Sequence, residues 1–172
     1  LLYGLARQWT DRAAAFWATL GIWLGTPVVF YSHGAPAYSH AASLFAVTSF
    51  LVVWHRTRPL TTRRPRHWLA LGALAALVTM VREQDAFFAV GVALDYVWTQ
   101  VTEWRRTGRP DLRERVGGLF AGALTCAVCF LPQAWAYIVL NGRLGPARVV
   151  SDKMRWSAPH AGQVLFSPEH GL

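Results

Sequence analysis

The side chains best suited to ligand binding or catalysis form a short polar run between two apolar stretches: Arg82, Glu83, Gln84 and Asp85. Arginine presents a rigid fork of donors that suits a phosphate or a carboxylate. Glu83 or Asp85 can hold that guanidinium in place, bind a metal or accept a hydrogen bond from a ligand hydroxyl. A solvated turn whose charges neutralise each other is an equal alternative. The run therefore predicts either a binding site for a polar ligand or a plain helix connection.

A second polar concentration occupies residues 30–40, with the sequence FYSHGAPAYSH. Its Gly-Ala-Pro centre favours a tight turn, and His33, Tyr38 and His40 around that turn are candidate ligand-binding residues. His40 falls just inside the following apolar stretch, where an imidazole needs a hydrogen-bond partner. Packing and ligand binding both remain open for these rings.

Three further side chains lie inside apolar stretches. Asp95 can pair with an Arg or His of another helix, line a polar cavity or reach water, and we expect pairing because an ionisable group at membrane depth is costly. Cys126 and Cys129 share a helix face at this spacing, but a zinc site needs further ligands, and none lies nearby in the sequence. We interpret the cysteines as packing residues, neither a metal site nor a disulfide.

Five apolar stretches must position these groups: Ala13 to Tyr31, Ala37 to Trp54, Trp68 to Val81, Ala86 to Val101 and Val116 to Leu140. A membrane-spanning helix needs about 20 apolar residues. The third and fourth stretches are shorter, but one helix across both would be about 50 Å long at about 1.5 Å per residue. That length overshoots a bilayer core of about 30 Å. The sequence predicts an all-α, polytopic integral membrane protein with about five transmembrane helices of a helical bundle.

Basic residues occupy every second gap between these stretches. One gap holds Arg56, Arg58, Arg63, Arg64 and Arg66, and another holds Arg105, Arg106, Arg109, Arg113 and Arg115. The gap Ser32 to Pro36 holds no Lys or Arg. This alternation follows the positive-inside rule. It predicts that Ser32 to Pro36, Arg82 to Asp85 and the tail from Asn141 all face the extracytoplasmic side.

Composition supports a membrane location. The chain is 53% hydrophobic and 15% charged, against about 25% charged residues in soluble domains. Its net charge of +8 does not indicate nucleic acid, because the arginines lie in short gaps beside apolar runs and few interleave with aromatics on a polar face. We expect membrane lipid as a partner, with arginines near anionic headgroups, and no nucleic acid.

The two ends of the chain suggest a piece of a longer protein. The sequence begins at Leu1 without a signal region, and it ends on Ser167-Pro168-Glu169-His170-Gly171-Leu172. We expect a transmembrane helical region over residues 1–140 and an extracytoplasmic loop over 141–172 that leads to a further span. Glu169 and His170 would then lie on the outer side.

Three segments together carry a family resemblance: YSHGAPAYSH at residues 31–40, GALAALVTMVR at 72–82 and FSPEHGL at 166–172. With the Arg-rich gap between the first two, they resemble the bacterial GT-C glycosyltransferases, which include protein O-mannosyltransferases and the lipid A aminoarabinose transferase. The resemblance covers most of the chain. It implies a multi-pass enzyme of the bacterial inner membrane. Such an enzyme transfers a sugar from a polyprenyl-phosphate donor to a lipid, glycan or protein acceptor at the extracytoplasmic face.

The resemblance also implies roles for the polar residues. Arg82 would stabilise the departing phosphate, and the other substrate-binding candidates are Glu83, Gln84, Asp85, His33, Tyr38, His40, Glu169 and His170. The catalytic carboxylate would belong to a first extracytoplasmic loop, which we expect upstream of Leu1. His40 stands where the family often has an acidic residue, which argues against a direct acid or metal role there. No cofactor is assigned, and the resemblance leaves room for a divalent metal.

The main alternative is a non-enzymatic polytopic membrane protein, either a transporter subunit or an assembly scaffold. A transporter would show broken helices and an internal repeat, and the 172 residues contain no such repeat. A scaffold would tolerate replacement of Arg82, Glu83, Asp85 and His40 without loss of a chemical activity.

Overall fold

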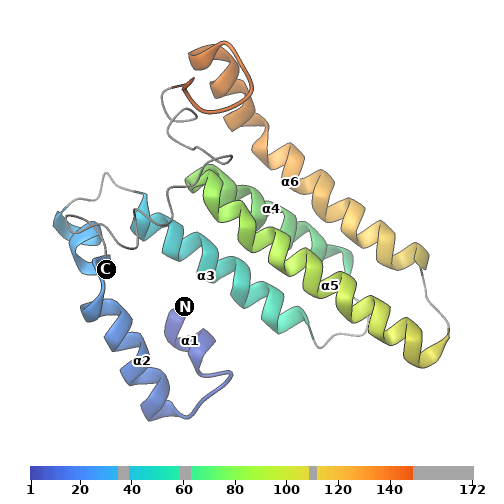
Figure 1. The fold of residues 1–172 in the computed structure, drawn as a ribbon, viewed down its shortest axis with the longest axis horizontal. Coiled ribbons are helices and arrows are strands. Elements are labelled where there is room, and N and C mark those ends of the chain that lie inside the picture. Colours follow the sequence, from blue (N-terminus) through green and yellow to red (C-terminus); the bar gives the residue numbers. More distant parts are fainter. Residues whose placement is uncertain (35–38, 59–62, 109–111, 149–172) are drawn as a thin grey trace, which may run out of the picture. The chain divides into compact units, whose positions relative to one another are not determined.

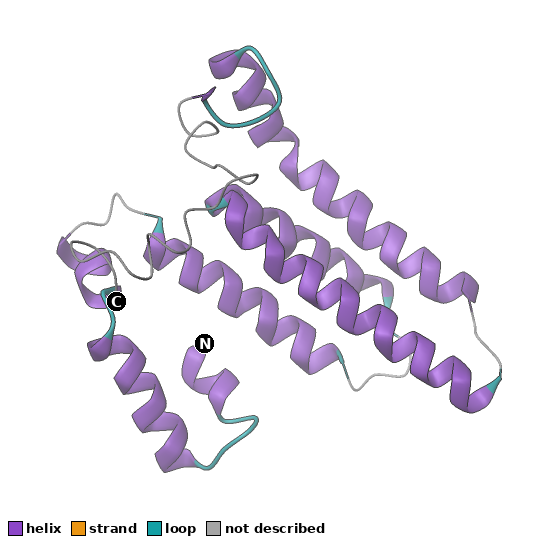
Figure 2. Ribbon diagram, viewed as in Figure 1, coloured by secondary structure: helices purple, strands orange, loops and turns teal. Residues whose placement is uncertain are grey.

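The computed structural model describes residues 1–34, 39–58, 63–108 and 112–148. All regular structure in these ranges is helical (Figure 2). The α helices are α1 (Leu2–Ala6), α2 (Arg12–Gly25), α3 (His40–Thr57), α4 (Pro65–Val81), α5 (Ala86–Thr107) and α6 (Leu112–Asn141), shown in Figure 1. A π-helical turn covers Phe30–Gly34 and a 3-10 turn covers Glu83–Asp85. The predicted all-α class is confirmed.

The chain divides into two units, Leu1–Leu131 and Pro132–Leu172. The second unit begins with the last turns of α6. After Asn141 the chain turns through Gly142, whose φ of 64° is left-handed, and the Asn141 amide donates to the carbonyl of Gly145 at 2.8 Å. The candidate functional residues that the structure describes all belong to the first unit.

Helix α2 ends earlier than the apolar stretch that contains it. The apolar stretch runs from Ala13 to Tyr31, but the helix stops at Gly25. Thr26 is extended, with φ −124° and ψ 163°, because a residue that precedes proline is disfavoured in the helical region. Pro27 therefore breaks the helix while the sequence stays apolar, and the span near residues 13–31 stays a prediction.

The predicted division of residues 68–101 into two helices is confirmed. Helix α4 ends at Val81, and Arg82 is extended with φ −150° and ψ 119°. The 3-10 turn then leads directly into α5. Helix α5 runs past the predicted end at Val101 to Thr107, where Gly108 takes a left-handed φ of 66°, the usual helix-ending role of glycine.

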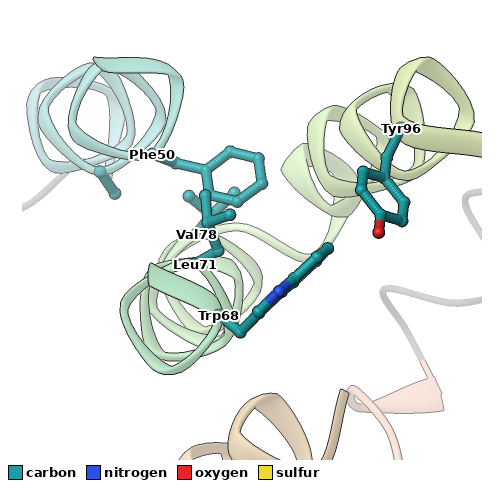
Figure 3. Close-up of a cluster of buried hydrophobic side chains, with 6 residues drawn as sticks. Phe50, Trp68, Leu71, Val78 and Tyr96 are labelled. Atoms are coloured by element: carbon teal, nitrogen blue, oxygen red, sulfur yellow. The ribbon is translucent and has the colours of Figure 1, made fainter. Parts of the chain in front are cut away.

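The core of the first unit lies between α3, α4 and α5. Figure 3 shows Phe50 of α3 above Leu71 and Val78 of α4, while Trp68 and Tyr96 meet beside them. The Trp68 and Tyr96 rings form an edge-to-face pair with centroids 4.9 Å apart, a favourable aromatic geometry. This cluster aligns the three helices and so determines which of their ends meet.

Helices α4 and α6 approach each other through glycine. A Cβ atom added at Gly72 of α4 would overlap the carbonyl oxygen of Gly122 of α6 and would lie 2.9 Å from the Cβ of Thr125. Gly118 lies one turn before Gly122, and a Cβ atom added there would overlap the indole of Trp68. Small residues four apart allow such close backbone contact, which is a common device between membrane helices.

One helix of the described residues, Val116–Asn141, is long and apolar enough to cross a membrane. Pro65–Val81 is a shorter apolar helix. Helix α2 has 14 residues, and α5 contains charged residues such as Asp95, Glu103 and Arg105. The five-span architecture is therefore not confirmed and stays a prediction.

Candidate functional site

Three helix ends meet where the polar run lies. Helices α3 and α4 pack along each other in opposite directions (Figure 1), so the first residue of α3 lies beside the last residues of α4. The 3-10 turn packs against the ends of both α4 and α5. Residues 40 and 82, which are 42 positions apart in the sequence, are thereby brought into contact.

Arg82 is the centre of this group. Its Nη1 lies 3.1 Å from Nδ1 of His40, and its Nη2 donates to Oε1 of Gln84 at 3.0 Å. A guanidinium only donates hydrogen bonds, so Nδ1 of His40 must be the acceptor and the imidazole is the neutral tautomer that carries its proton on Nε2. The His40 ring is also held by Tyr31, with centroids 4.3 Å apart and an interplanar angle of 34°.

Asp85 has a partner that the sequence analysis missed. The buried Ser43 hydroxyl of α3 donates a short hydrogen bond to Oδ2 of Asp85. Ser43 lies three residues after His40, and residues at that spacing share one face of a helix. That spacing is the signal that could have identified Ser43. The bond ties the start of α3 to the start of α5 and orients the carboxylate.

The charges in this group do not neutralise each other by direct contact. In the described part of the chain Arg82 forms no ion pair within 4.0 Å, and both of its side-chain hydrogen bonds go to neutral groups. Glu83 and Gln84 are exposed, whereas Arg82 and Asp85 are half-buried. A cation that is held by neutral partners can still bind an anion, because neither partner neutralises its charge.

The remaining candidates lie outside this group. His33 is exposed, and its Nδ1 lies 3.3 Å from the carbonyl of Val29 in its own turn. Tyr38, Glu169 and His170 fall outside the described residues. The structure thus joins Arg82, Gln84 and His40 by contact and brings Asp85 to the same helix ends.

No cluster of three or more His, Cys, Asp or Glu residues suited to a metal ion occurs among the described residues. The Arg82 group, with a single neutral imidazole and a serine-bonded carboxylate, does not fit a metal. Cys126 and Cys129 are both free thiols.

Asp95, at the opposite end of the bundle, forms an ion pair with an arginine, as predicted. Nη2 of Arg58, at the end of α3, donates to Oδ1 of Asp95 at 2.8 Å. The two side chains are 50% and 23% exposed, so the ion pair lies at the edge of the bundle. The Arg58 guanidinium also lies over Trp54, with its central carbon 5.5 Å from the ring centroid.

Comparison with known proteins identifies a family for the chain. A family model described as dolichyl-phosphate-mannose-protein mannosyltransferase matches residues 1–136, a range that includes α1 to α5 and the whole Arg82 group. Searches of curated proteins and of solved structures gave no match. The match covers well over half of the 172 residues and agrees with the resemblance of the polar motifs. The chain therefore belongs to the dolichyl-phosphate-mannose-protein mannosyltransferase family, which comprises membrane glycosyltransferases of the GT-C type.

Proposed function

We propose that this chain takes part in transfer of a sugar from a polyprenyl-phosphate donor to a lipid, glycan or protein acceptor at the extracytoplasmic face of the bacterial inner membrane. Arg82 holds the phosphate of the donor in this proposal. The observation that carries it is the half-buried guanidinium of Arg82, which two neutral side chains hold at the helix ends. A positioned cation of this kind stabilises the charge that develops on a departing phosphate.

The reaction gives each neighbour a role. The acceptor hydroxyl oxygen bonds to the anomeric carbon, the bond from that carbon to the phosphate oxygen breaks, and polyprenyl phosphate leaves with the bonding electrons. The hydroxyl proton passes to a general base, for which the family resemblance implies a carboxylate. Arg82 binds the leaving phosphate, while Gln84, Glu83 and Asp85 can bind sugar hydroxyls.

His40 acts in this proposal by positioning Arg82. Its lone pair on Nδ1 fixes one terminal amino group of the guanidinium, and Tyr31 fixes the imidazole. The exposed His33, together with Tyr38, Glu169 and His170, would contribute further contacts to the substrate. These four assignments rest on the family resemblance and on the shared outer side that the basic loops predict.

The distribution of apolar side chains supports the membrane location and the multi-pass topology. Large side chains such as Trp135, Leu94 and Trp17 are 70%, 64% and 66% exposed, while the small Ala46 and Ala76 are fully buried. A surface of this kind favours lipid contact over water. The arginine-rich gaps at the other helix ends support an outer position for the Arg82 group.

The direct test is sugar transfer by membranes that contain the protein, measured with a labelled polyprenyl-phosphate sugar. Arg82→Ala removes the phosphate contact, and a hydrogen bond to a charged group is worth about 1.5–3 kcal/mol. We expect transfer to fall by roughly ten- to a hundredfold at unchanged protein level. Arg82→Lys retains the charge but loses the fork, so it should recover only part of the activity.

Arg66→Ala is the matched control. Arg66 is exposed in the first turn of α4 and carries the same charge, and it lies at the end of that helix opposite Arg82. Its transfer rate should stay within about twofold of the unmodified protein. Equal rates for Arg82→Ala and Arg66→Ala would show that Arg82 does not bind the leaving phosphate.

A further inference from the structure

The first unit contains a groove that the proposed transfer chemistry does not use. It has a volume of about 330 Å³ and lies between α3, α4, α5 and the first half of α6. Its walls include the small residues Gly72, Ala75, Ala89 and Gly122. The volume lies near the lower end of the roughly 300–1,000 Å³ of small-molecule sites.

The groove has one charged lining residue, Arg63, which lies just before α4 and so opposite Arg82 along that helix. Its guanidinium carbon lies 5.4 Å from the Trp68 ring centroid and 5.2 Å from that of Tyr96. Its Nε donates to the hydroxyl of Thr57 at 3.2 Å. These contacts fix the plane of the guanidinium at the groove.

Arg63 is a half-buried cation that has no direct counter-charge among the residues that the structure describes. The nearby Asp95 carboxylate bonds to Arg58 instead, and Arg63 forms no ion pair within 4.0 Å in the described ranges. Burial lowers the pKa of the Arg63 guanidinium, yet an arginine stays protonated in proteins. Its terminal amino groups, which carry no hydrogen bond to any described residue, can therefore bind an anion at the groove.

We propose that this groove binds an anionic phospholipid, with one acyl chain along the small apolar residues and the phosphate on Arg63. The groove opens along α5, where the lining residue Val90 is 53% exposed. The lining, mostly apolar with one cation at Arg63, matches the charge and polarity of a phosphate joined to an acyl chain. The proposal rests on the membrane location of the chain and not on sugar transfer.

Native mass spectrometry of the detergent-purified chain tests the proposal. Phosphatidylglycerol and phosphatidylcholine with identical acyl chains are added in equal amounts, and the retained lipid is measured. We expect the unmodified protein to retain phosphatidylglycerol preferentially. Arg63→Gln should weaken that binding by about tenfold or more, because the contact is a hydrogen bond between charged groups.

Two further variants separate the groove from general surface charge. Arg66→Gln makes the same charge change at an exposed residue that does not line the groove, so it should retain phosphatidylglycerol within about twofold. Ala93→Phe adds a ring at an exposed lining position and should reduce retention of either lipid. The thermal unfolding midpoint of each variant confirms that it is folded.

Four outcomes would overturn the assignment. Equal retention of the two lipids would remove the role of the headgroup charge, and equal losses for Arg63→Gln and Arg66→Gln would indicate general attraction. Unchanged retention by Ala93→Phe would place the lipid elsewhere. Displacement of phosphatidylglycerol by an equimolar amount of polyprenyl phosphate would assign the groove to that lipid. Loss of sugar transfer in any variant does not bear on this result.

Discussion

Replacing Gly72 by alanine tests the closest helix contact in the structure. The added methyl group would overlap the Gly122 carbonyl oxygen, and a backbone atom cannot move aside as the tip of a side chain can. Overpacking of a tight contact costs about 1–3 kcal/mol, while alanine is favoured over glycine in a helix by about 1 kcal/mol. Because the overlap is with a backbone atom, the overpacking cost should lie in the upper part of that range. We therefore expect the free energy of unfolding to fall by about 1–2 kcal/mol.

The assay is thermal unfolding of the purified protein in detergent. At about 2–4 °C per kcal/mol for a chain of this size, Gly72→Ala should lower the unfolding midpoint by about 2–8 °C. Gly91→Ala of α5 is the control, because a Cβ at Gly91 meets nothing within 4 Å, and it should be neutral or slightly stabilising. If the two variants unfold at the same temperature, α4 and α6 do not approach through Gly72.

Two further expectations concern the opposite end of the bundle and the topology. Asp95→Asn should destabilise the protein by at most about 1 kcal/mol, because Arg58 and Asp95 are partly exposed and solvent screens such pairs. In a thermal double-mutant cycle, the charge-swapped variant that combines Arg58→Asp with Asp95→Arg should be more stable than either single variant. In a background whose two native cysteines are alanine, His33→Cys and Arg66→Cys should react with an impermeant thiol reagent from opposite sides of the membrane. Labelling of the two cysteines from one side would disprove the alternating topology.

The sequence predicted helix existence better than helix ends. The apolar stretches indicated which segments avoid water. The exact end of a helix, however, depends on local backbone sterics, which hydrophobicity does not reveal. Pro27 forces Thr26 out of the helical region, although the residues on both sides are apolar. At α5 the opposite occurs, because polar residues after Val101 continue the helix until Gly108 ends it. Both differences follow from backbone geometry and not from hydrophobicity.

The candidate site was only partly predictable for a different reason. Arg82, Gln84 and Asp85 are adjacent in the sequence, so their grouping needed no knowledge of the fold. The contact of Arg82 with His40 depends on the antiparallel packing of α3 on α4, which the alternating topology implies only in general terms. The bond from Ser43 to Asp85 depends further on which face of α3 turns toward α5. Rotation of a helix about its axis is set by packing of the core, and the apolar pattern of α3 is too uniform to reveal it.

Three arginines at the helix ends, Arg58, Arg63 and Arg82, differ in what surrounds them, and the difference bears on function. Arg58 faces a carboxylate and is neutralised within the fold, so its contribution is structural. Arg82 and Arg63 contact neutral or aromatic groups, which position a guanidinium without reducing its charge. Such contacts yield little net stability on their own, since each cation loses solvation without gaining a countercharge. Binding of an anion compensates that cost, and this is the physical basis for assigning ligand contacts to Arg82 and Arg63 and a folding contact to Arg58.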